Sequence, residues 1–83
     1  MSAMVNVLIV DDSPTARRML ASVINAAPGM RVVGEAINGR QSIKLANDLR
    51  PDVILMDAIM PEMDGLEATR EIMHATPMPI VVC

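Results

Sequence analysis

The chain has 83 residues and a net charge of −3, and 52% of its residues are hydrophobic although it contains no Phe, Tyr or Trp. A chain of this length forms one small domain at most, and the hydrophobic content predicts a folded core. The absence of a basic patch, of a long apolar run and of a second cysteine excludes nucleic-acid binding by this segment, a membrane span and an internal disulfide framework. We therefore expect a cytoplasmic protein whose single cysteine, Cys83, lies in the core.

The first half of the chain predicts two strands separated by a helix. Residues 5–11 contain the apolar run Val7–Val10, which is typical of a strand that is buried on both faces. Ser13 and Pro14 favour a helix start, and Pro28-Gly29 favours its end. Between them the apolar face of the helix consists of Ala16, Met19, Leu20, Val23, Ile24 and Ala27. Residues 31–36 are less apolar and predict an edge strand.

The second half repeats this alternation. Asn38-Gly39 predicts a turn before a second helix that ends at Pro51, and residues 53–57 predict a third strand. After a loop at 58–63, Asp64 is expected to cap a third helix, and a fourth strand begins at Ile80. The predicted inner faces of these two helices are Ser42, Leu45, Ala46 and Leu49, then Ala68, Thr69, Ile72 and Met73. The pattern predicts an α/β fold: a doubly wound parallel sheet with helices on both faces.

Three carboxylates stand at the ends of two predicted strands. Asp11 and Asp12 follow the first apolar run, and Asp57 follows the run Val53–Met56. Parallel strands bring their carboxyl ends to one edge of the sheet, where such folds bind their ligands. Because like charges this close repel one another, the cluster predicts a bound cation, a shifted pKa, or both. Mg²⁺ suits the site best, since it takes oxygen ligands.

The three acids have different predicted roles. Asp57 can act as a nucleophile toward a phosphoryl group and form an acyl phosphate. Asp12, just past its strand, is expected to contact the cation directly, whereas Asp11 assists through water or positions its neighbour. Arg17 and Arg18 follow one helical turn later, and we interpret both as solvated charges.

Three segments resemble the receiver domain of bacterial two-component response regulators. They are Val-Asp-Asp-Ser-Pro (10–14), Pro-Asp-Val-Ile-Leu-Met-Asp (51–57) and Met-Pro-Glu-Met-Asp-Gly (60–65). The stretch Ser13-Pro14-Thr15 and the ending Pro-Met-Pro-Ile-Val-Val (77–82) are most similar to the receiver half of the chemotaxis protein-glutamate methylesterase. The resemblance implies a flavodoxin-like sheet of strand order 2-1-3-4-5, of which four strands and three helices are expected here.

The resemblance also implies a function. Asp57 would accept a phosphoryl group from a histidine kinase in a phosphorelay that requires Mg²⁺. Asp12, Asp57 and the backbone carbonyl of Ile59 would hold the metal, with Asp11 assisting. Residues 1–83 would form the N-terminal part of a receiver domain, because the Ser or Thr and the Lys that bind phosphate in the family are not among them. The chain would be a signalling module rather than an enzyme, and any effector activity would lie outside it.

Two rival hypotheses remain at this point. A Mg²⁺-dependent aspartyl phosphohydrolase would use the same nucleophile, but it usually needs a second acid two residues later, where this chain has Ile59. Alternatively, the chain is a fragment that forms a homo-oligomer through the unfinished edge of its sheet, without efficient phosphorylation.

Overall fold

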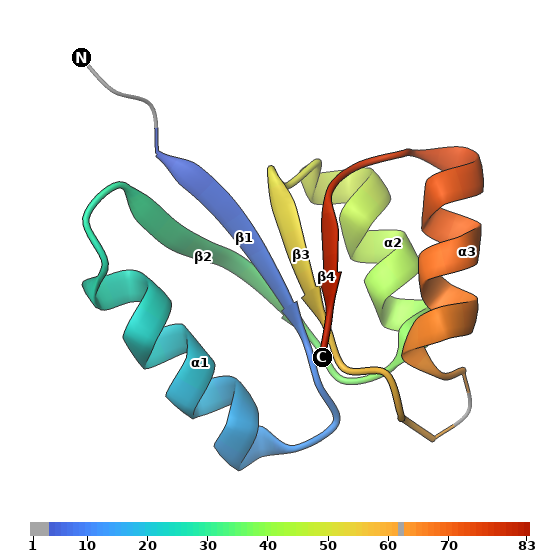
Figure 1. Cartoon of the computed structure of the whole chain (residues 1–83), viewed down its shortest axis with the longest axis horizontal. Coiled ribbons are helices and arrows are strands. Elements are labelled where there is room, and N and C mark those ends of the chain that lie inside the picture. Colours follow the sequence, from blue (N-terminus) through green and yellow to red (C-terminus); the bar gives the residue numbers. More distant parts are fainter. Residues whose placement is uncertain (1–3, 62) are drawn as a thin grey trace.

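A computed structural model of the chain describes residues 4–61 and 63–83. Within these ranges the elements are β1 (Val5–Val10), α1 (Pro14–Ala26), β2 (Met30–Ala36), α2 (Gly39–Leu49), β3 (Val53–Met56), α3 (Gly65–Ala75) and β4 (Ile80–Val82). All strand pairs are parallel, and the strand order is β2-β1-β3-β4. Figure 1 shows α1 on one side of the sheet and α2 and α3 on the other. The predicted doubly wound α/β fold with four strands and three helices is confirmed.

Each helix begins at a polar side chain that caps its first turn. The side-chain oxygens of Ser13, Asn38 and Asp64 accept hydrogen bonds from backbone N–H groups three residues later. Such caps satisfy N–H groups that have no partner inside the helix. The caps at Ser13 and Asp64 were predicted. Asn38 and Gly39 form the cap and first residue of α2 instead of a separate turn.

The core consists of two apolar clusters, one on each side of the sheet. On the α1 side, Val7 and Ile9 of β1 pack with Ile24. On the other side, Leu8 and Val10 pack among buried residues of β3, α2 and α3. Successive strand residues point to opposite faces, so β1 contributes to both clusters. The predicted burial of β1 on both faces is confirmed, and so is the position of β2 at an edge.

The predicted helix faces are partly wrong. Met19 and Val23 of α1 are 65% and 69% exposed. Among the described elements α1 is alone on its side of the sheet (Figure 1), so only the stripe that faces the strands is covered. Leu49 and Met73 are also exposed, although the remaining predicted inner-face residues of α2 and α3 are buried or half-buried.

The prediction that Cys83 lies in the core is also wrong. Cys83 is exposed, because β4 is the last strand in the sheet order and has a neighbouring strand on one side only.

None of the helices in the described ranges is long and apolar enough to cross a bilayer.

Candidate functional site: an acidic cluster at the carboxyl edge of the sheet

The register of the sheet places Asp11 beside Asp57. Val10 of β1 is paired with Met56 of β3, so the residues that follow them leave the sheet side by side. The Asp57 N–H donates to the Val10 carbonyl oxygen at 2.9 Å. The Asp11 N–H donates in turn to the carbonyl oxygen of Ala36 in β2, at 3.1 Å. Backbone hydrogen bonds therefore fix the starting points of both acidic segments at one edge of the sheet, where β1 and β3 end in Figure 1.

The three aspartates gather at this edge. One carboxylate oxygen from each of Asp11, Asp12 and Asp57 lies within 4.8 Å of the others. Asp11 and Asp57 are half-buried, and Asp12 is exposed. Three negative charges this close repel one another, and carboxylate oxygens are the ligands that Mg²⁺ prefers. The cluster can therefore attract and hold a divalent cation.

Local hydrogen bonds orient two of the three carboxylates. Asp11 Oδ1 accepts a hydrogen bond from the Ser13 N–H at 2.9 Å, and Asp57 Oδ1 accepts one from the Ile59 N–H at 3.2 Å. These bonds leave Oδ2 of each side chain free of protein donors within the described part of the chain. In the same part of the chain no donor reaches the Asp12 carboxylate, so both of its oxygens are available. Each aspartate can thus offer at least one oxygen to a cation.

Ile59 enters the site through its backbone. Ile59 is 84% exposed, and its N–H is the group that contacts Asp57. The role expected for its carbonyl as a metal ligand stays a prediction. The loop that carries Ile59 is anchored by the buried side chains of Met60 and Met63, which belong to the larger core cluster.

Arg17 has a place in this region that the sequence did not indicate. Its Nη1 donates to the carbonyl oxygen of Asp11 at 2.8 Å, and its Nε lies 3.3 Å from Glu35 Oε1. Its side chain is only 16% exposed, so the prediction of a solvated charge is wrong for Arg17. Arg18 is exposed, as predicted.

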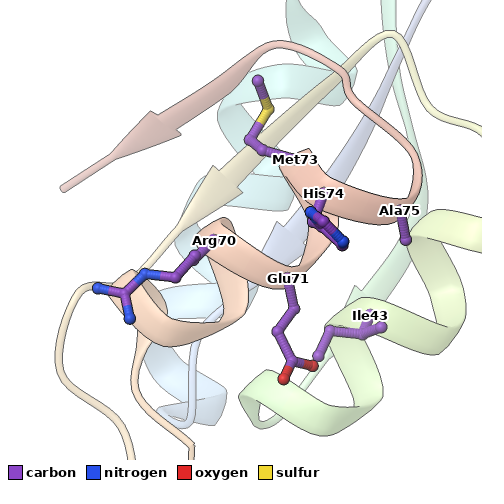
Figure 2. A pocket seen from close by; sticks show the side chains of 6 residues that line it. All are labelled: Ile43, Arg70, Glu71, Met73, His74 and Ala75. Atoms are coloured by element: carbon purple, nitrogen blue, oxygen red, sulfur yellow. The ribbon is translucent and has the colours of Figure 1, made fainter.

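An open pocket of about 640 Å³ lies elsewhere, between α2 and α3. Figure 2 shows Ile43 reaching into it from α2, opposite Glu71 of α3. Its lining residues are Ile43, Arg70, Glu71, Met73, His74 and Ala75. No member of the acidic cluster is among them, so this pocket is separate from the carboxylate site.

The chain is similar to known proteins both in sequence and in fold. The family model of the response regulator receiver domain matches residues 7–83. The chain is 53% identical over 76 residues to protein-glutamate methylesterase/protein-glutamine glutaminase 4 of Myxococcus xanthus, a match that covers 92% of this chain and 22% of that protein. It thus spans about a fifth of the length of the curated relatives it matches.

Solved structures are also similar to this chain, and two of them illustrate the match. The response regulator domain of CheB from Thermotoga maritima superimposes with a TM-score of 0.94 and 40% identity, covering 95% of this chain and 59% of that one. A CheX–CheY–BeF₃–Mg²⁺ complex from Borrelia burgdorferi gives a TM-score of 0.79 and 30% identity, covering 93% and 59%. The predicted similarity to the receiver half of chemotaxis methylesterases is confirmed. The chain therefore belongs to the response regulator receiver domain family, whose members are phosphoacceptor modules of two-component signalling.

Proposed function

We propose that Asp57 is the phosphoacceptor of this chain and that Asp11, Asp12, Asp57 and the backbone carbonyl of Ile59 hold Mg²⁺. The observation that carries the proposal is the convergence of three carboxylates within 4.8 Å at the carboxyl edge of a parallel sheet. The half-buried Asp57 lies at the end of β3, and the more exposed Asp12 lies in the loop opposite.

The donor set fits a hard divalent cation. It is made of carboxylate oxygens, and it carries three like charges with no cationic side chain bonded to any of these carboxylates in the described ranges. The related complex from Borrelia burgdorferi, which contains BeF₃ and Mg²⁺, supports this choice of metal. When bound, Mg²⁺ neutralises negative charge on the phosphoryl oxygens during transfer.

One of the two oxygens of the Asp57 carboxylate is oriented to attack the phosphorus atom. Because Oδ1 accepts the Ile59 N–H and keeps a second lone pair for the cation, we assign the nucleophilic role to Oδ2. Oδ2 forms the new bond to phosphorus while the bond between phosphorus and the imidazole nitrogen of a phosphohistidine breaks. The nitrogen keeps the electron pair and takes a proton from solvent. The Ile59 N–H continues to hold Oδ1, which is the carbonyl oxygen of the resulting acyl phosphate.

This chemistry implies a histidine kinase as partner and a cytoplasmic location. Residues 1–83 would form the N-terminal part of a receiver domain, which agrees with their covering 59% of the matched CheB domain. The names of the curated relatives suggest a protein-glutamate methylesterase as the effector, outside these residues. The comparisons do not support a phosphohydrolase, and Ile59, with its exposed apolar side chain, offers no general acid.

The proposal is tested by labelling with a small phosphodonor in the presence of Mg²⁺. The wild-type chain should gain one phosphoryl group that hydroxylamine removes, and Asp57→Asn should gain none, as measured by intact mass. Asp48→Asn is the matched control, because Asp48 is an aspartate of α2 whose contact is an exposed pair with Lys44, and such pairs contribute little to stability. Undiminished labelling of Asp57→Asn would show that another residue accepts the phosphoryl group.

A further inference from the structure

Arg17 connects three elements next to the acidic cluster. It belongs to the second turn of α1, its Nη1 donates to the backbone of Asp11 just beyond β1, and its Nε pairs with Glu35 near the end of β2. A guanidinium presents several N–H donors in a fixed plane, so it can hold two acceptors in one geometry. The Arg17 side chain is largely shielded from solvent, whereas that of Glu35 is 43% exposed, so solvent weakens the ion pair more than it weakens the hydrogen bond to the Asp11 carbonyl.

These contacts complete the fixation of the Asp11 backbone. Its N–H is bonded to Ala36 of β2, its carbonyl to Arg17, and its Oδ1 to the N–H of Ser13. The loop from Asp11 to Ser13 contains Asp12, whose own side chain receives no hydrogen bond from the described residues. The position of the Asp12 carboxylate therefore depends on how firmly its two neighbours are held.

We propose that Arg17 is a positioning residue of the acidic site. By bridging the Asp11 carbonyl and the Glu35 carboxylate of β2, it keeps the carboxylates of Asp11 and Asp12 placed for a divalent cation. The inference rests on the proposed metal site and adds a residue that is not itself a ligand. Groups that orient the ligands of a metal commonly affect its affinity about 10–100-fold when they are removed.

Electrostatics and positioning predict opposite effects for the loss of Arg17. The guanidinium is a positive charge beside the site, so its removal alone would reduce repulsion and strengthen Mg²⁺ binding. If Arg17 positions the loop, its removal weakens binding instead. Arg18 provides a matched control because it carries the same charge on the same helix, is exposed, and makes no side-chain hydrogen bond or ion pair with the described residues.

The experiment compares Arg17→Gln with Arg18→Gln in the 83-residue chain by Mg²⁺ titration, followed through backbone amide NMR shifts at fixed ionic strength. We expect Kd for Mg²⁺ to rise about tenfold in Arg17→Gln and to stay level or fall in Arg18→Gln. With a small phosphodonor, Arg17→Gln should need more Mg²⁺ for half-maximal labelling, yet it should approach the wild-type rate at saturating Mg²⁺. If Arg17 had a purely structural role, its loss would not raise the Mg²⁺ requirement while leaving the labelling rate at saturating Mg²⁺ near the wild-type value.

Amide hydrogen exchange without metal gives a second measurement. Arg17→Gln should speed exchange at Asp11 and Ser13 and leave Leu8 and Ile9 of β1 protected; if it does not fold, Arg17→Lys, which retains a single point donor, is compared in its place. Equal Kd values in the Arg17 and Arg18 variants, with normal wild-type binding, would overturn this inference alone. A wild-type chain without affinity for Mg²⁺ would overturn the proposed metal site, and the inference with it.

Discussion

The backbone carbonyl of Asp57 occupies the space that a side chain at Gly65 would need. A Cβ atom at Gly65 would overlap the Asp57 carbonyl oxygen and lie 2.9 Å from the Cα atom of Ala58. The Gly65 N–H also donates to the carbonyl oxygen of Ala58 at 2.9 Å. The first turn of α3 therefore rests directly on the backbone that carries the proposed phosphoacceptor, and only glycine permits this approach.

We expect Gly65→Ala to affect both stability and phosphorylation. Forcing a methyl group against rigid backbone costs about 1–3 kcal/mol of unfolding free energy, and the displaced Asp57 should be labelled more slowly. Urea unfolding and the rate of labelling by a small phosphodonor measure the two effects.

Gly29→Ala separates these effects. Gly29 has a φ of +79° and open space around its Cβ position, so alanine there causes backbone strain far from the site. That strain costs about 1–2 kcal/mol, but the labelling rate should not change. Equal rates in the two alanine variants would mean that contact with Gly65 does not position Asp57.

Asp12→Asn should weaken Mg²⁺ binding while it stabilises the metal-free chain. Among the described residues no donor reaches either oxygen of Asp12, so Asp12 has more free oxygens to offer a cation than Asp11 or Asp57. Loss of one carboxylate ligand should raise Kd for Mg²⁺ about tenfold or more, which corresponds to about 1.4 kcal/mol or more of binding free energy. The same substitution removes one of three repelling charges, so the metal-free Tm should rise. A lower Tm without metal would indicate that the Asp12 carboxylate has a stabilising partner in the chain.

Self-association through β4 stays a prediction that the structure makes specific. Val81 and Val82 of this edge strand are exposed, and an exposed apolar edge is a template for pairing with another chain. We expect the chain to self-associate in sedimentation velocity, and Val81→Lys to shift it toward monomer because charged side chains block edge pairing. Val23→Lys places the same charge on exposed α1 and should leave association unchanged. A monomeric wild-type chain would contradict this prediction.

The sequence was sufficient to predict that the three aspartates gather, because each strand and the acid that follows it are marked locally. Two apolar runs marked the strands, and the parallel arrangement required by the intervening helices brought Asp11 and Asp57 to one edge. The observed register agrees with this prediction, because Val10 and Met56, the last residues of β1 and β3, are paired.

Features that depend on contacts between distant segments were not predictable in this way. The pairing of Arg17 with Glu35 requires the relative placement of α1 and β2, which no spacing in the sequence encodes. Helical periodicity likewise gave α1 an apolar face wider than the strands beneath it can cover, so Met19 and Val23 were assigned to the core incorrectly. The periodicity of a helix reports which residues share a face, whereas its burial depends on how many neighbours it meets.

The alternation of side chains along β1 ties the two halves of the molecule together. Val7 and Ile9 belong to the apolar cluster beneath α1, while Leu8 and Val10 belong to the cluster beneath α2 and α3. Neither layer of helices can detach without exposing a strand that the other layer also needs. Thermal unfolding should consequently be cooperative and occur in one transition. Local opening of one layer of helices should also destabilise the other layer, because both pack on β1.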